Sequence, residues 1–150
     1  MPSTQRLQFI TEIAAPPAEV SARMTALESY RDWTRAFCDG STYEGSWEPG
    51  ARIRFLAPSG DGMVAEIAEH RPGAFISIRH LGWVVKGVDD TESDSVRAWA
   101  PAYENYRFEP VPGGTRLVVD QDMTGEYVDY MQRTWPLALA RLKALCEAKA

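Results

Sequence analysis

The chain has 150 residues, a length that suits one domain able to bury about two-thirds of its unfolded surface. Its formal net charge is −5 and its isoelectric point is about 5.1, so its field repels phosphates and argues against nucleic acid as a partner. No stretch reaches transmembrane length and the first residues contain no apolar signal-peptide core, so we expect a cytoplasmic protein without membrane insertion.

The first part of the chain predicts one strand and two short helices. Apolar residues alternate with polar ones over residues 6–13, which indicates a strand that ends at Pro16 and Pro17. Helical spacing of apolar residues follows over 17–27, and Tyr30, Trp33 and Phe37 indicate a second short helix that ends near residue 39.

Four further strands are predicted over residues 41–47, 51–57, 62–70 and 74–81. The separators between them are short and rich in Pro and Gly, a pattern that favours an antiparallel meander. Residues 83–101 break this rhythm with an acidic run between Trp83 and Trp99. The spacing from Thr91 to Asp94 fits a capping box, so we expect a loop with one short helical turn.

The last third predicts a β-hairpin followed by one long helix. Residues 103–108 and 115–119 flank a Pro/Gly-rich turn, and apolar residues at helical spacing run from about 125 to 148. Pro136 lies inside that stretch, and we expect a continuous, bent helix. An alternative is that Thr134 caps a new helix with Pro136 in its first turn.

These elements predict an α+β fold. A curved antiparallel sheet of six to seven strands should surround the long C-terminal helix, with residues 6–13 pairing to 115–121. This arrangement is called a helix-grip fold. We expect it to occupy residues 1–150 as a single domain.

Short sequence motifs in the same order resemble the START-like (SRPBCC) helix-grip superfamily, and more specifically its bacterial branch related to the activator of heat-shock protein 90 ATPase. The motifs are Tyr30-Arg31-Asp32-Trp33-Thr34, Gly62-Met63-Val64, Ile78-Arg79-His80-Leu81-Gly82, Asp90-Thr91-Glu92-Ser93, Glu104-Asn105-Tyr106, Gly113-Gly114-Thr115, Trp135-Pro136-Leu137-Ala138-Leu139 and Leu142-Lys143. The resemblance implies the helix-grip fold and no particular substrate, because members of this superfamily transport, cyclise, sense hormones or assist chaperones.

The strand pattern brings His80 and Glu104 together on the concave face of the predicted sheet. If Phe108 lies opposite both Ile76 and Leu117, then Tyr106 lies opposite Ile78 and Val119, and Glu104 opposite His80 and Gln121. Continuing the same rule places Met63 beside His80, and Phe55 beside Met63. The other histidine, His70, lies at a predicted turn and is expected to be solvated.

Three roles for His80 and Glu104 stay open. They can satisfy each other's hydrogen bonds in the interior, anchor a ligand, or act as an acid/base pair in a cyclase, dehydratase or hydrolase. We expect a small, largely apolar ligand between sheet and helix, and a co-chaperone-like module with a protein partner is a further alternative. The predicted ligand-binding residues are Phe55, Met63, Ile78, His80, Trp83, Glu104, Tyr106, Gln121, Tyr127, Met131 and Trp135.

Other chemistry lacks a signature in this sequence. There is no phosphate-binding glycine loop, nucleophile elbow or zinc spacing, so no cofactor and no metal is expected. The acidic run at 89–94 lacks the spacing of a calcium loop and is interpreted as solvated. Cys38 and Cys146 stand alone, and we expect both to be small buried residues in a reducing compartment.

Overall fold

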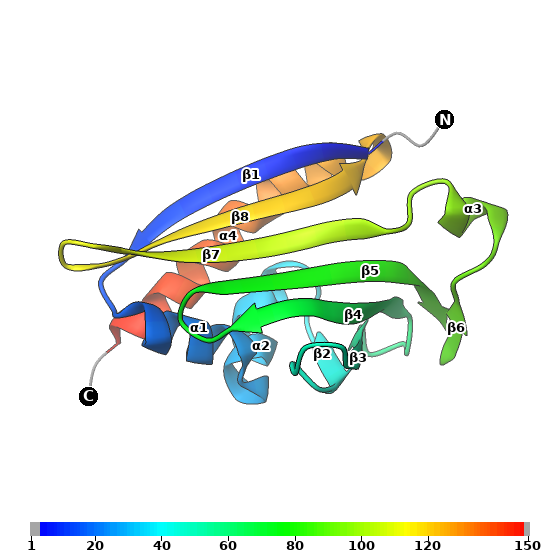
Figure 1. Cartoon of the computed structure of the whole chain (residues 1–150). Coiled ribbons are helices and arrows are strands. Elements are labelled where there is room, and N and C mark those ends of the chain that lie inside the picture. The colour runs from blue at the N-terminus through cyan, green and yellow to red at the C-terminus, as the bar shows by residue number, and fades with distance from the viewer. Residues whose placement is uncertain (1–3, 149–150) are drawn as a thin grey trace.

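The computed structural model describes residues 4–148, which form one curved antiparallel sheet, one long helix and several short helical segments (Figure 1). The strands are β1 (Thr4–Ile13), β2 (Thr42–Gly45), β3 (Arg52–Leu56), β4 (Gly62–Arg71), β5 (Phe75–Val85), β6 (Val88–Asp90), β7 (Ala102–Val111) and β8 (Gly114–Thr124). The helical segments are α1 (Pro17–Thr25), α2 (Leu27–Trp33), η1 (Thr34–Ala36), α3 (Asp94–Arg97), η2 (Gly125–Tyr127) and α4 (Val128–Glu147).

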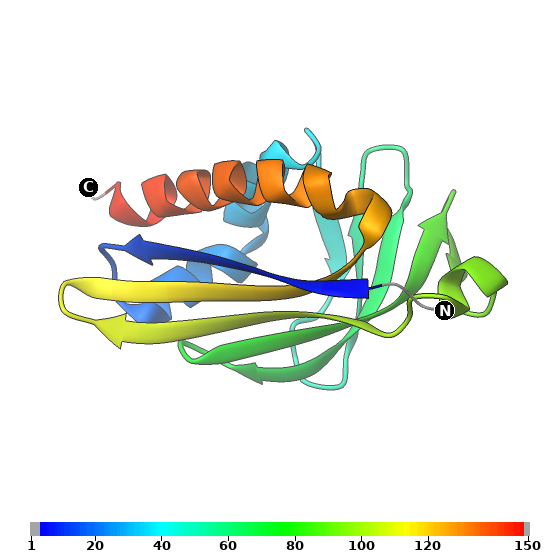
Figure 2. The same cartoon turned by 90° about the horizontal axis from the view of Figure 1, so that it is seen from above.

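The sheet confirms the predicted fold class. Its strand order is β1-β8-β7-β5-β4-β3-β2, and β1 pairs with β8 from Thr4 opposite Thr124 to Ile13 opposite Thr115. Tight turns join most neighbouring strands because the Pro/Gly separators are short, as the sequence predicts. Figure 2 shows α4 lying along one face of the sheet, which is the grip arrangement.

An eighth strand, β6, comes from the segment expected to be mostly loop. Lys86 and Gly87 both have positive φ angles, 51° and 82°, so the chain makes a two-residue hairpin turn and Val88 pairs with Val85. A turn of this kind needs two left-handed residues, and only the glycine signals it in the sequence. The short helix α3 is present, but its N-cap is Ser93 rather than Thr91, and the Ser93 hydroxyl accepts from the Val96 amide.

The helix α4 continues through Pro136, so the alternative in which Thr134 starts a new helix is wrong. One face of α4 is buried against the sheet and against α1 and α2. The fully or nearly buried residues of that face are Trp135, Ala138, Leu139, Leu142 and Cys146. Met131 and Leu145 are partly buried against the same core. Pro136 is exposed, as is the neighbouring Leu137 at 61%, so the proline lies on the outer side of the helix.

The helices α1 and α2 close one end of the space between sheet and α4. Trp33 donates from its indole nitrogen to the Met24 carbonyl at 3.2 Å, which fixes α2 on α1. The Trp33 ring then lies 6.0 Å from the Trp135 ring, and Tyr30 meets Tyr43 edge-on at 5.0 Å. These aromatic contacts tie the helical pair to both α4 and β2, so the wall they form is fixed by packing.

Truncation of the buried face of α4 should cost much more stability than truncation of its exposed face. Leu142→Ala removes a side chain with 0% exposure, and we expect the free energy of unfolding to fall by about 2–5 kcal/mol because a cavity remains. Leu137→Ala, the same change on the exposed side, should alter it by about 0.5 kcal/mol or less. Chemical denaturation of both variants measures the difference, and equal losses would contradict the packing of α4 described above.

Candidate functional site

A pocket of about 560 Å³ lies between the concave face of the sheet and α4; we call it the main pocket. Its floor comes from the middle strands, β3, β4, β5, β7 and β8, and its roof from the first half of α4. Residues of α1, α2 and the following segment to Ser41 close one end. Aromatic rings supply much of the wall, so the space is mainly apolar.

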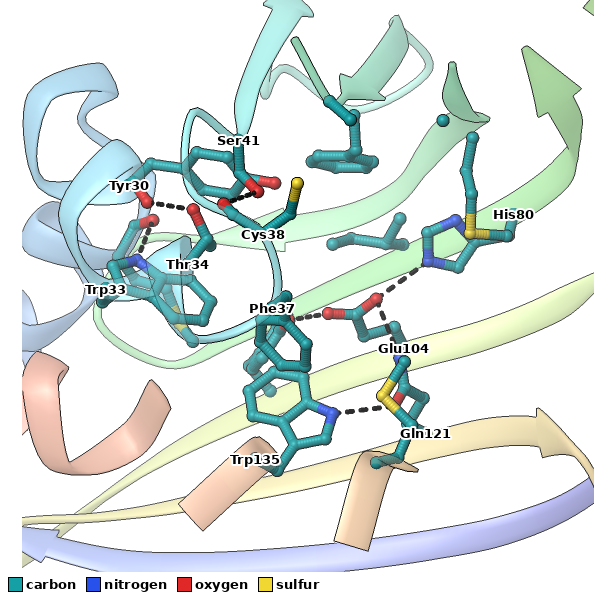
Figure 3. A pocket seen from close by; sticks show the side chains of 18 of the residues that line it. Tyr30, Trp33, Thr34, Phe37, Cys38, Ser41, His80, Glu104, Gln121 and Trp135 are labelled. Carbon is teal, nitrogen blue, oxygen red and sulfur yellow. Dashed lines mark hydrogen bonds and ion pairs between the residues drawn. The ribbon is translucent and has the colours of Figure 1, made fainter. Parts of the chain in front are cut away.

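Five side chains form a hydrogen-bonded polar cluster in the wall of the main pocket (Figure 3). His80 Nε2 lies 2.9 Å from Glu104 Oε1, and the Gln121 amide donates to the same oxygen at 3.3 Å. The Tyr106 hydroxyl donates to the other oxygen, Glu104 Oε2. Trp135 donates from its indole nitrogen to Gln121 Oε1 at 2.8 Å, which joins α4 to the cluster.

The predicted register is right between β7 and β8 and wrong between β5 and β7. Glu104 lies opposite Gln121, but its partner on β5 is Ile78, and His80 lies opposite Ala102. The strands are therefore shifted by two residues from the prediction, and a shift of two keeps every side chain on its predicted face. His80 and Glu104 are diagonal neighbours, and the glutamate side chain is long enough to reach across.

The predicted neighbours of His80 on β4 are also wrong. Phe55 lies opposite Met63 as predicted, but Met63 pairs with Trp83, and His80 pairs with Ala65. The pairing of β4 with β5 shifts between Val64 and Ala65, and an irregularity of this kind has no signal in the alternation pattern.

His80 has one nitrogen engaged and one without a partner. An ionised carboxylate only accepts hydrogen bonds, so the His80 Nε2 atom carries the hydrogen, and in the neutral ring Nδ1 is left as an acceptor. Among the described residues Nδ1 has no hydrogen-bond partner, and His80 is only 6% exposed. A buried acceptor without a partner lowers the free energy of unfolding by about 1–3 kcal/mol, so a ligand that donates a hydrogen bond to Nδ1 would recover this loss.

Glu104, in contrast, has little accepting capacity left. Its two oxygens already accept from His80, Gln121 and Tyr106, which uses three of about four acceptor positions. The side chain is 14% exposed. We therefore interpret Glu104 as the residue that orients its neighbours, and His80 as the group with free hydrogen-bonding capacity.

A second pocket of about 330 Å³, the side pocket, adjoins the main pocket near α3 and η2. The two share part of their walls, including Met63, His80, Gln121 and Met131. Trp83 and Trp99, whose rings meet at 5.0 Å, line the side pocket and belong with Val96 to a small core of their own.

The structure places every predicted ligand-binding residue except Trp83 in the wall of the main pocket, and Trp83 in the wall of the side pocket. The prediction missed the contribution of Tyr30, Thr34 and Phe37 at the closed end. The spacing of Tyr30 and Phe37 indicates a helix, and this spacing does not show that their rings line a pocket. Burial raises the pKa of the Tyr30 hydroxyl well above its usual value, and the nearby Glu104 and Tyr43 act in the same direction.

Cys38 and His70 differ from their predictions. Cys38 is exposed at the pocket wall, whereas Cys146 is buried as expected. His70 is half-buried, and its Nδ1 lies 2.9 Å from the Trp47 carbonyl oxygen. Cys38 follows η1, whereas His70 lies near the end of β4, just before the turn to β5, and the local sequence pattern does not show which parts of the chain either residue meets.

The acidic run of 89–94 serves local structure. Asp89 binds Arg54 through two hydrogen bonds at 2.8 and 2.9 Å, and the Arg54 guanidinium lowers the pKa of this carboxyl. Asp90 accepts from the amides of Glu92 and Ser93 at 3.2 and 3.0 Å. Residues 4–148 contain no cluster of histidine, cysteine and acidic side chains suited to hold a metal ion.

Solved structures share this fold at low sequence identity. Protein MLL2253 from Mesorhizobium loti has a TM-score of 0.76 and 15% identity, over 97% of this chain and 99% of its own. The Aha1 dimer from Colwellia psychrerythraea has a TM-score of 0.71 and 17% identity, over 96% and 97%. CalU16 from Micromonospora echinospora has a TM-score of 0.67 and 16% identity, over 98% and 77%.

These neighbours support the helix-grip fold, and at such identities they show the fold alone. No family model matches the chain, and no curated protein matches it. Membership of the bacterial branch related to the activator of heat-shock protein 90 ATPase therefore stays a prediction. Within residues 4–148, no helix has the length and apolar character needed to cross a membrane.

Replacing the Glu104 carboxylate with an amide should weaken the polar cluster. In Glu104→Gln one acceptor oxygen becomes a donor, which cannot satisfy His80, Gln121 and Tyr106 together, and we expect a loss of about 1–3 kcal/mol in the free energy of unfolding. Glu109→Gln, the same change farther along β7 and outside both pockets, should cost much less. Urea denaturation compares the two, and equal stability would show that the cluster contributes nothing to folding.

Proposed function

We propose that this protein reversibly binds a small, largely apolar molecule in the main pocket, between the sheet and α4. The observation that carries the proposal is an aromatic-lined space of about 560 Å³ with one polar cluster in its wall. Ligand sites commonly combine a mostly apolar wall with a few fixed polar groups that orient the bound molecule. The volume falls within the range of about 300–1,000 Å³ that is usual for such sites.

The arrangement of the polar cluster supports a site that is formed before the ligand arrives. Glu104 holds His80 on one side and Gln121 on the other, and Gln121 in turn holds Trp135 of the roof. Phe55 contacts the imidazole edge-on at 5.9 Å. A ligand entering this space loses little binding free energy to ordering the protein, because these side chains already restrain one another.

Binding of an uncharged, environment-sensitive dye tests this proposal. Nile red should bind the native protein saturably and quench tryptophan emission, since Trp33, Trp47 and Trp135 all line the main pocket. Met131→Trp should fill part of that space and weaken binding by about tenfold or more. Leu137→Trp, on the exposed side of the same helix, is the matched control and should bind like the native protein. Unchanged affinity in a folded Met131→Trp protein would place the dye elsewhere and argue against the proposal.

Ligand binding should also restrain the segment that contains β6 and α3. Ser95 of α3 lines the side pocket next to the main one, and Trp83 and Trp99, which flank this segment, line it too. We expect amide hydrogen exchange in residues 86–98 to slow at saturating Nile red. Unchanged exchange there would show that this segment is a passive part of the surface.

A proton-transfer enzyme is the second candidate function, and the observation that favours it is the free Nδ1 of His80. A carboxylate that holds one imidazole nitrogen leaves the other as a base, which is the arrangement by which enzymes orient a catalytic histidine. Native mass spectrometry of protein purified from its own host would identify a retained molecule. An enzyme would convert that molecule, and His80→Gln would abolish conversion while binding persists.

The interaction-module alternative has weaker support. Its basis is the shared fold with the Aha1 dimer and the exposed Val85 and Val88 at the β5–β6 hairpin, 52% and 67% exposed. A pull-down at moderate salt, with Val88→Asp as the comparison, addresses it. Retention of a partner by the native protein and its loss in the variant would favour this alternative.

A further inference from the structure

Buried polar atoms without partners gather around the side pocket. Three of them belong to residues in its wall: His80 Nδ1, Trp99 Nε1 and Thr124 Oγ1. His80 is 6% and Trp99 is 9% exposed, so water does not satisfy these atoms at the surface. Buried polar groups are nearly always paired, and three such exceptions around one pocket point to a molecule that supplies the missing partners.

The chemistry of the three atoms restricts that molecule. In the neutral imidazole that donates from Nε2 to Glu104, His80 Nδ1 needs a donor, and an indole nitrogen can only donate. The Thr124 hydroxyl can do either. A hydroxyl group, or a hydroxyl next to a carbonyl, offers both a proton and acceptor lone pairs, whereas a hydrocarbon offers neither.

The charges around both pockets argue against an anionic ligand. Among the described residues, no lysine and no arginine lines either pocket, whereas Glu104, Asp122 and Glu126 are among the lining residues. Asp122 pairs with Arg6 at 2.9 Å, so part of this negative charge is compensated. A carboxylate or phosphate would enter a mainly apolar space without a cation to pair with, which is costly.

We infer that the two pockets form one elongated site for an uncharged molecule with an apolar body and a hydroxyl-bearing end. The body lies in the main pocket, and the hydroxyl end reaches the side pocket, where it donates to His80 Nδ1 and an oxygen accepts from Trp99 Nε1. This inference rests on the proposed function. It goes beyond the proposed function because it assigns the chemical class of the ligand and excludes fatty acids and other anions.

The shared wall of the two pockets allows this occupancy. Met63 and Met131 line both, and methionine has flexible side-chain torsions that let it move aside at little cost. Such a movement is required because the three unpaired atoms are covered by neighbouring groups, each with almost no accessible surface. The hydroxyl end of the ligand therefore reaches the three unpaired atoms only when the side chains of Met63 and Met131 move.

Three probes with one apolar tail test the inference by isothermal titration calorimetry: octylbenzene, 4-octylphenol and 4-octylbenzoate at neutral pH. We expect 4-octylphenol to bind at least about fivefold more tightly than octylbenzene, because its hydroxyl group can form one or two hydrogen bonds to buried groups of the protein. The anionic 4-octylbenzoate should bind more weakly than 4-octylphenol. Tighter binding of 4-octylbenzoate would overturn the inference, and so would equal binding of octylbenzene and 4-octylphenol.

These outcomes separate the inference from the function on which it rests. Octylbenzene that binds without any preference for the phenol would leave the apolar site intact and refute the hydroxyl end group. Failure of all three probes, together with failure of Nile red, would refute both.

A variant pair locates the end group. Trp99→Phe keeps an aromatic ring and removes the indole donor, so the preference for 4-octylphenol over octylbenzene should shrink by about threefold or more while octylbenzene affinity stays the same. Tyr103→Phe removes a polar group from a residue that lines neither pocket, and it should keep the full preference. His80→Gln tests the other end of the proposed contact. The glutamine amide can both donate to Glu104 and accept from a ligand, so this variant should keep part of the preference for 4-octylphenol over octylbenzene. An unchanged preference in folded Trp99→Phe would remove Trp99 from the site.

Discussion

The centre of this molecule is organised by the hydrogen bonds that a carboxylate needs when it lies in a mainly apolar space. Glu104 accepts hydrogen bonds from His80 on β5, Tyr106 on its own strand and Gln121 on β8. Gln121 then binds Trp135, so the same network reaches the helix. An unpaired charge at this depth would be strongly destabilising, and the network therefore fixes the relative positions of the sheet and the helix that it connects.

The faces of the strands could be predicted from the sequence, whereas the pairing of individual residues was only partly predictable. Alternation places Ile76, Ile78 and His80 on one face of β5, and they do share it in the structure. The offset between β5 and β7 was not accessible, because the strands are joined by a long segment that contains β6 and α3 rather than by a tight turn. Where a tight turn does join strands, as between β7 and β8, the predicted pairs of Glu104 and Tyr106 are right.

The closed end of the main pocket shows a different limit of prediction. Tyr30, Trp33 and Phe37 have a spacing that indicates helix, and the helix forms, but the spacing does not say what the rings meet. Trp33 and Phe37 both contact the Trp135 ring, which is about a hundred residues away in sequence, at 6.0 and 5.1 Å. Contacts between residues so far apart in sequence depend on how α2 and α4 are placed by the whole fold, and local spacing carries no information on that placement.

The small core of Val96, Trp99 and Ala102 is separate from the main core between the sheet and α4. It exists because β7 pairs with β5 only as far as His80, and β6 takes over the same edge from Trp83 onward. Two cores of unequal size can open with unequal free energies, since each is held by its own buried contacts. Under the proposed binding function, opening of the small core alone would set the rate at which the ligand enters and leaves, so substitutions there would change its residence time more than they change the packing of the main core.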